Sequence, residues 1–141
     1  MLRNSLSKKV LGITLSNKAV LMLKSPFYPG EAVKRLLGSP HRKAAVVTDG
    51  VNGVWFAGEG DTTVRYQAAF SVTVCDTTGC GDVFHGAYAA SLTFGMALPD
   101  RVRFATAAAA LKAARKGGQT GAPTQQEVVA FLEKHAGEQP T

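Results

Sequence analysis

The sequence predicts an α/β fold in which strands and helices alternate and the strands run parallel. Residues 29–38 carry apolar side chains at helical spacing, and the continuous apolar run at 44–48 is typical of a strand buried on both faces. Farther along, the alternating segment 70–74 predicts a strand that passes through a glycine turn into an apolar helix, from residue 83 to about 93. Such alternation of helix and strand is typical of layered α/β domains.

Length and composition indicate one globular domain. The chain has 141 residues, of which 45% are hydrophobic and 18% are charged. We therefore predict a single domain over residues 1–141, with residues 1–25 poorly defined and a polar tail at 136–141. No apolar run reaches the ~18 residues of a membrane span, and the basic N-terminus is a poor signal peptide. A cytoplasmic location is the expectation.

Charge and cysteine content argue against two classes of protein, those that bind nucleic acid and those that bind zinc. The net charge is +6, but the Lys and Arg residues are scattered and not grouped with aromatic residues, so nucleic-acid binding is not expected. The charge is compatible with a nucleotide polyphosphate as ligand. The two cysteines, Cys75 and Cys80, lie in one short segment, and no second Cys/His pair stands at zinc spacing. We expect both thiols to be reduced.

The N-terminal elements follow from periodicity and from helix breakers. A buried strand is expected within residues 10–16, and a short helix at 17–24 would end before Pro26. The helix at 29–38 is expected to stop at Gly38.

Four more elements are expected in the second half of the chain. Residues 54–57 and 62–67 predict two antiparallel strands. Asp100 is expected to cap a helix from residue 101 to about 115, and Thr124 with Glu127 predicts a capping box that opens the last helix.

The loop after the buried strand has two interpretations. Thr48, Gly50 and Gly53 form a Thr-x-Gly-x-x-Gly pattern, which suits a plain hairpin turn. The same pattern also suits a turn that exposes backbone N–H groups and a hydroxyl at the carboxyl end of a strand, where open α/β sheets bind ligands. The residues alone leave both interpretations open.

The segment 75–82 is the strongest candidate for chemistry. Gly79, Cys80 and Gly81 stand where a strand is expected to turn into a helix, and the free N–H groups of a helix start attract anions. Asp82 follows directly, so a carboxylate able to accept a proton would lie beside an anion site. The alternative is a tight turn in which Asp82 is only the N-cap.

The stretch Asp-Thr-Thr-Gly-Cys-Gly-Asp-Val-Phe-His-Gly-Ala at 76–87 resembles the C-terminal signature of the PfkB, or ribokinase-like, carbohydrate kinases, which more often have Ala at the position of Cys80. The resemblance runs from about residue 30 to 132, and more faintly back to Leu11. It implies a ribokinase-like three-layer α/β/α fold and ATP-dependent phosphoryl transfer to a sugar hydroxyl, with Mg²⁺ bridging the phosphates. Family members are about twice as long. The resemblance therefore implies the nucleotide-binding, catalytic C-terminal half, without the N-terminal half and the lid.

The resemblance also assigns roles to single residues. Asp82 would be the catalytic base, and the N–H groups of Gly79, Cys80 and Gly81 would form the anion hole. The nucleotide would be held by Thr48, Gly50, Gly53, Gly81 and Thr106. The family surrounds a K⁺-type ion with backbone oxygens, which here would come from Asp76, Thr78, Lys112, Arg115, Gly117 and Gly121.

Two features depart from the family pattern. Asn17 could match the Asn of an Asn-x-x-Glu segment near the metal, but Val20 stands where the Glu is expected, and Asn17 also suits an ordinary helix cap. The missing sugar-binding half predicts a partner, either a second copy or a separately encoded N-terminal half, with ATP and a small sugar as ligands. The alternative is a truncated, inactive fragment that binds nucleotide or has only a structural role.

Overall fold

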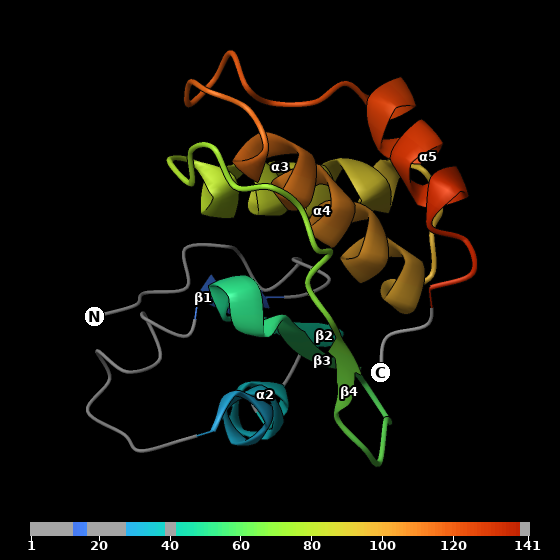
Figure 1. Cartoon of the computed structure of the whole chain (residues 1–141). Helices are drawn as coiled ribbons and strands as arrows, with labels where there is room; N and C mark the ends of the chain where they lie inside the picture. Colours follow the sequence, from blue (N-terminus) through green and yellow to red (C-terminus); the bar gives the residue numbers. More distant parts are fainter. Residues whose placement is uncertain (1–12, 17–27, 39–41, 139–141) are drawn as a thin grey trace. The chain divides into compact units, whose positions relative to one another are not determined.

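A computed structural model describes residues 13–16, 28–38 and 42–138 (Figure 1). It divides into two compact units, Met1–Asp49 with Trp55–Arg65, and Gly50–Val54 with Tyr66–Thr141. The expectations for the helix at 17–24, including Asn17 and Val20, lie outside the described residues. Whether the chain behaves as the predicted single domain stays a prediction.

The strands form one sheet in the order β1-β2-β3-β4, namely β1 (Ile13–Ser16), β2 (Ala44–Thr48), β3 (Val54–Gly58) and β4 (Arg65–Gln67). β1 pairs with β2 in parallel, and Ser16 lies opposite Thr48. This pairing confirms the predicted parallel strands and the β1 part of the strand expected at 10–16. β4 is shorter than the strand expected at 62–67.

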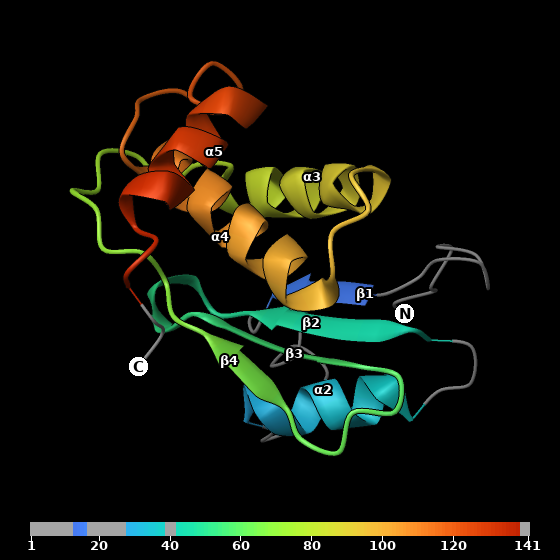
Figure 2. The same cartoon turned by 90° about the vertical axis from the view of Figure 1, so that its right-hand side faces the viewer.

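In the first unit, α2 (Pro29–Leu37) packs against the sheet, along β2 and β3 (Figures 1 and 2). Pro29 lies in the first turn of this helix, where its missing N–H costs nothing. The Gly38 N–H donates to the carbonyls of Lys34 and Arg35, so the helix stops where it was predicted to stop. The buried core of this layer consists of Ala32, Val33, Ala45, Val47 and Ala57.

The described part of the second unit contains three α-helices, α3 (Cys80–Thr93), α4 (Leu98–Ala113) and α5 (Gln125–Lys134). α3 and α4 lie side by side in both views (Figures 1 and 2), and the small alanine side chains of α4 permit this close approach. The buried core shared by α4 and α5 consists of Phe104, Ala107, Ala108 and Val128. No helix in the described part of the chain has the length and apolar character needed to cross a membrane.

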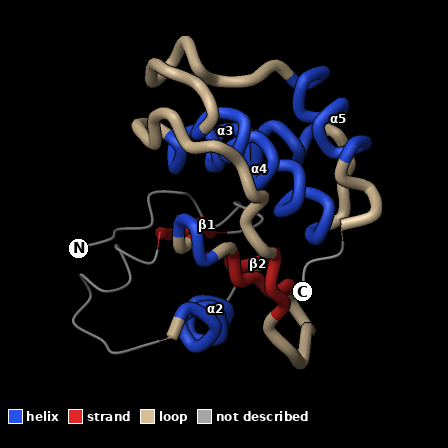
Figure 3. Tube along the Cα trace, in the orientation of Figure 1, coloured by secondary structure: helices blue, strands red, loops and turns tan. Residues whose placement is uncertain are grey.

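The strand predicted at 70–74 is wrong, because this segment forms a loop (Figure 3). The Phe70 ring packs edge-on against Phe131 of α5, with 5.2 Å between ring centroids. The N–H groups of Cys75 and Asp76 both donate to the Ala113 carbonyl, at 2.7 and 3.1 Å. The segment is therefore tied to the helices of its own unit and not to a neighbouring strand.

The starts of two helices also differ from expectation. α3 begins at Cys80, three residues before the expected start, so the glycine turn lies partly inside the helix. α4 begins at Leu98 with Ala97 as N-cap, so the expected capping role of Asp100 is wrong. Pro99 explains the earlier start, because its fixed φ suits the first helical turn.

The loop after β2 contains the short 3-10 helix η1 (Gly50–Asn52), with Gly50 at φ 53° and Gly53 at φ 94°. A Cβ on Gly53 would lie 2.5 Å from the Gln67 carbonyl oxygen and 2.7 Å from the Tyr66 ring. A Cβ on Gly50 would meet nothing within 4 Å. Gly53 is therefore required by packing against β4, whereas Gly50 leaves its backbone open to solvent.

This contrast predicts different costs for the two alanine substitutions. Gly53→Ala combines a positive φ with a backbone collision, and should lower the free energy of unfolding by more than about 3 kcal/mol. Gly50→Ala is the matched control and should cost only about 1–2 kcal/mol, the cost of the left-handed backbone. Urea unfolding followed by circular dichroism measures both, and equal losses would contradict the packing role of Gly53.

Candidate active site

The glycine turn predicted from the sequence forms the start of α3. Gly79 is the N-cap with φ 78°, a left-handed conformation that favours glycine, and no side chain caps this helix end. Cys80, Gly81 and Asp82 are the first three residues of the helix. The interpretation of Asp82 as a simple N-cap is therefore wrong.

The backbone N–H groups of this turn are only partly used. Cys80 N–H donates to the Thr77 carbonyl at 3.2 Å. Within residues 42–138, no backbone carbonyl accepts from the N–H of Gly79 or Gly81. Two donors at the positive end of the α3 dipole are thus available to an anion, and a third would have to leave a long bond to Thr77.

Asp82 lies exposed in the first turn of α3. In the described part of the chain its carboxylate makes no hydrogen bond or ion pair. A carboxylate at the start of a helix is favoured by the helix dipole, yet nothing in the packing of the unit requires it. Asp82 therefore has its oxygens free to accept a proton next to the N–H groups of Gly79 and Gly81.

Asp76 connects this turn to the glycine-rich loop after α4. Its Oδ1 accepts the Thr78 N–H at 2.9 Å, and its Oδ2 accepts the Gly117 N–H at 3.1 Å. The pKa of the Asp76 carboxyl lies below its usual range, chiefly because the Thr78 backbone and side chain and then the Gly117 N–H stabilise its ionised form. The two loops also touch directly, since a Cβ on Gly79 would lie 3.7 Å from the Gly118 Cα.

The residue that sequence reasoning missed is the Lys112 side chain. Lys112 is fully buried, and its Nζ donates to the Asp76 carbonyl at 3.0 Å and to the Arg115 carbonyl at 3.4 Å. Only its backbone oxygen was expected to matter, and that oxygen accepts the Arg115 N–H at 3.0 Å. The helical spacing of Lys112 from the buried Ala105 and Ala108 was the available signal that this lysine points inward.

The residues expected to surround a K⁺-type ion do come together, but around this ammonium group. Two of the expected carbonyls, those of Asp76 and Arg115, accept hydrogen bonds from Lys112. A Cβ on Gly121 would lie 2.9 Å from the Lys112 Cδ, so the lysine stem fills the space beside that glycine. A K⁺ ion does not fit at these two carbonyls while Lys112 is in this position.

Cys80 lies beside the polar groups around Lys112. Its Sγ lies 4.0 Å from the Asp76 carbonyl oxygen, and burial raises the pKa of its thiol. Both cysteines are free thiols, which agrees with the expectation that they are reduced. Cys80 therefore serves as a small side chain in a tight turn.

The predicted nucleotide contacts are distributed over both units. Thr48 ends β2 in the first unit, whereas Gly50, Gly53 and Thr106 belong to the second. Thr106 is buried in α4, and its hydroxyl donates to the Val102 carbonyl at 2.7 Å. This hydroxyl can therefore only accept a further hydrogen bond. The roles of these four residues stay predictions.

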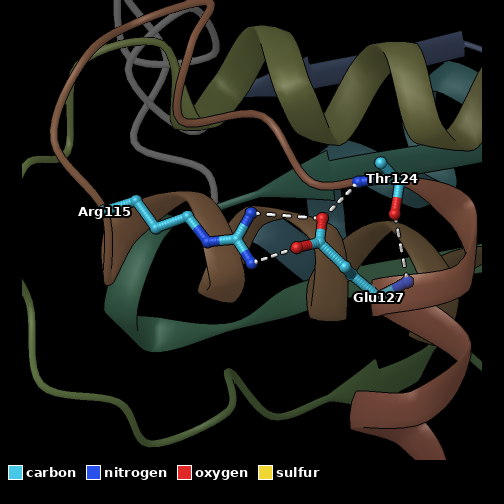
Figure 4. Close-up of polar contacts among 3 residues, drawn as sticks. All are labelled: Arg115, Thr124 and Glu127. Carbon is cyan, nitrogen blue, oxygen red and sulfur yellow. Dashed lines mark hydrogen bonds and ion pairs between the residues drawn. The ribbon is translucent and has the colours of Figure 1, made fainter.

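The loop after α4 is anchored to α5 by an ion pair (Figure 4). Arg115 makes two parallel bonds to Glu127, of 3.2 and 2.8 Å, and Glu127 also accepts the Thr124 N–H at 2.7 Å. The Thr124 hydroxyl accepts the Glu127 N–H, so the predicted capping box is confirmed. Hydrogen bonds from Arg115 and then from the Thr124 N–H lower the pKa of Glu127 from 4.5 to about 2.

This arrangement predicts a pH-dependent effect of Glu127→Gln. Because the pKa of Glu127 is lower in the folded state, its stabilising effect is fully present above pH 4.5 and is lost as pH falls toward about 2. The variant should unfold at lower urea concentration than the wild type near neutral pH, with a difference that shrinks on acidification across that range. Glu133→Gln, an exposed change in the same helix, should not lower the urea midpoint at any pH. A difference for Glu127→Gln that does not change with pH would contradict this role.

Solved structures share this fold. Ribokinase from Thermotoga maritima matches at a TM-score of 0.78 with 31% identity, over 88% of this chain and 42% of that chain. A putative ribokinase II from E. coli, in complex with ATP and Mg²⁺, matches at a TM-score of 0.76 with 26% identity, over 91% of this chain and 41% of that one. These similarities confirm the predicted partial ribokinase-like α/β fold.

Sequence comparison gives the same family. Ribokinase from Lactococcus lactis is 36% identical over 107 residues, which are 76% of this chain and 35% of that protein. Ribokinase from Haemophilus influenzae is 35% identical over 91 residues, which are 64% of this chain and 29% of that protein. This chain thus spans about a third of the length of the curated relatives that it matches. Because the profile of the pfkB family carbohydrate kinases matches residues 18–125, the chain belongs to that family.

Proposed function

We propose that this chain supplies the nucleotide-binding and catalytic part of a kinase that transfers the γ-phosphate of ATP to a hydroxyl of a sugar or sugar derivative. The observation that carries this proposal is the turn into α3. It sets an exposed, unpaired Asp82 three residues after the left-handed Gly79, whose N–H is free of backbone partners among residues 42–138. Membership in the pfkB family of carbohydrate kinases supports phosphoryl transfer as the reaction at this turn.

The proposed reaction uses the turn in two ways. The N–H groups of Gly79, Cys80 and Gly81 hold the oxygens of the transferred phosphoryl group, with Cys80 giving up its bond to Thr77. Asp82 accepts the proton of the sugar hydroxyl as its oxygen forms a bond to the γ-phosphorus, and the bond from that phosphorus to the bridging oxygen of ADP breaks. Mg²⁺, when bound, neutralises charge on the phosphates.

The assignment of ligands rests on similarity to solved relatives. The putative E. coli ribokinase II was solved with ATP and Mg²⁺, and Arabidopsis thaliana ribokinase, 25% identical to this chain at a TM-score of 0.76, was solved with ribose and ATP. On this basis we propose ATP with Mg²⁺ as the phosphoryl donor. Thr48, Gly50, Gly53, Gly81 and Thr106 would contact the nucleotide. We do not include K⁺, because the Lys112 ammonium lies on two carbonyls expected to bind it.

We further propose that the sugar is bound mainly by residues outside these 141. The chain covers 29–35% of the two ribokinases described above, and kinases must close over the acceptor to keep water from the phosphate. The remainder would come from a second copy of the chain or from a separately encoded N-terminal half. Solution mass of the purified particle distinguishes these two sources.

Asp82→Asn tests the proposed base. It should lower phosphoryl transfer from ATP to a panel of pentoses and hexoses by about 10²–10⁴-fold, because the proton acceptor is lost. ATP affinity, measured by calorimetry with Mg²⁺, should change by less than about threefold, because the N–H groups remain. Asp100→Asn is the matched control, since Asp100 is also an exposed aspartate at the third position of a helix, α4.

The outcomes separate the two candidate functions. Loss of phosphoryl transfer in Asp82→Asn, with transfer kept in Asp100→Asn, supports the kinase function. Full activity of Asp82→Asn refutes the role of Asp82 as catalytic base. The short span relative to the ribokinases favours one alternative, a nucleotide-binding fragment without catalysis. That alternative predicts ATP binding by calorimetry without turnover of any sugar, even when the missing N-terminal half is supplied.

A further inference from the structure

We propose that the Lys112 ammonium is a built-in monovalent cation that takes the place of the K⁺-type ion beside the anion hole, so that this chain does not require K⁺. This inference depends on the proposed function in one respect, the assignment of the N–H groups at the start of α3 as an anion hole. The position of the charge follows from contacts within the second unit alone. Lys112 is a positioning residue in this proposal, because it acts through the backbone that it holds.

The burial of Lys112 calls for an explanation. It is the largest fully buried side chain in the described part of the chain. A buried ammonium group is costly unless hydrogen bonds and an opposite charge compensate it. Here the carbonyls of Asp76 and Arg115 accept two of its three N–H bonds, and it attracts the ionised Asp76 carboxylate. These are the kinds of oxygen partner that a monovalent metal cation would need.

The surroundings of the ammonium coincide with the expected ion site. Asp76 and Arg115 bind its Nζ directly, and Gly121 lies against its stem. Thr78 and Gly117 are one hydrogen bond further away, since both donate their N–H groups to the Asp76 carboxylate. Every residue expected around the ion therefore contacts Lys112 or Asp76.

A chain of hydrogen bonds connects this charge to the proposed anion hole. Lys112 fixes the Asp76 carbonyl, the Asp76 carboxylate fixes the Thr78 N–H, and Thr78 directly precedes Gly79. On the other side, the Arg115 carbonyl held by Lys112 belongs to a residue whose side chain is bound by Glu127. A covalently attached cation cannot dissociate, so the shape of the turn does not depend on dissolved K⁺.

Thermal unfolding without ATP or sugar tests this inference. The midpoint of the wild-type chain should differ by less than about 1 °C between KCl, NaCl and choline chloride at equal ionic strength, because no ion binds specifically. Lys112→Ala removes the ammonium and opens space at the two carbonyls. Its midpoint in choline chloride should lie about 5–10 °C below the wild type, because two buried carbonyls lose their partner.

In KCl the unfolding midpoint of the Lys112→Ala chain should rise part of the way back to the wild-type value. In NaCl the midpoint should rise by less. Lys116→Met is the matched control, because it removes the same charge from an exposed lysine four residues away and should show no salt preference. A K⁺-specific rise in the wild-type midpoint would overturn the proposal. So would a folded Lys112→Ala chain that is equally stable in KCl and choline chloride.

If Lys112→Ala does not fold in any salt, the wild-type comparison decides the question by itself. A wild-type midpoint that is the same in all three salts then supports the built-in cation, and a K⁺-specific rise overturns it. These measurements need no kinase activity. A failure of the Asp82 experiment would therefore leave their outcome unaffected, and the two proposals can fail separately.

Discussion

The hydrogen bond from the Lys112 ammonium to the Asp76 carbonyl organises the candidate site. It joins the end of α4 to the segment that leads into α3, two parts of the chain separated by 36 residues. Around it, the Asp76 carboxylate holds the N–H groups of Thr78 and Gly117, and the Cys75 and Asp76 N–H groups share the Ala113 carbonyl. The polar groups of two glycine-containing loops thus satisfy one another, which leaves the N–H groups of Gly79 and Gly81 for a ligand.

The rest of the second unit supports this arrangement. Lys112 lies in the last turn of α4, a helix whose many small alanines permit close packing against α3. α5 fixes the following loop through the Arg115–Glu127 ion pair, which is strengthened by its bidentate geometry and by the capping box (Figure 4). An anion site of preorganised N–H groups requires such rigidity, because donors that must reorganise during the reaction lose much of their effect.

Local signals in the sequence predicted much of the fold. α2 was marked by spacing and by Gly38, β2 by a continuous apolar run, and α5 by the Thr124–Glu127 box, all of which act within a few residues. The turn at Gly79 was predicted for the same reason. The strand at 70–74 was wrong because its alternating pattern says nothing about two distant groups, Phe131, which packs on Phe70, and the Ala113 carbonyl, which binds the two residues after the segment. The inward position of the Lys112 side chain was missed for the same reason, since its partner Asp76 lies far away in sequence.

The complete burial of the Lys112 amine gives this chain an internal reporter of motion. An acylating reagent in solution cannot reach that nitrogen while α4 and its following loop are closed. Its labelling rate therefore measures how often the end of α4 opens, as backbone amide exchange does for a whole segment. Exposed lysines such as Lys116 and Lys134 would be acylated first, so the order of modification along the chain would rank local openings against global unfolding.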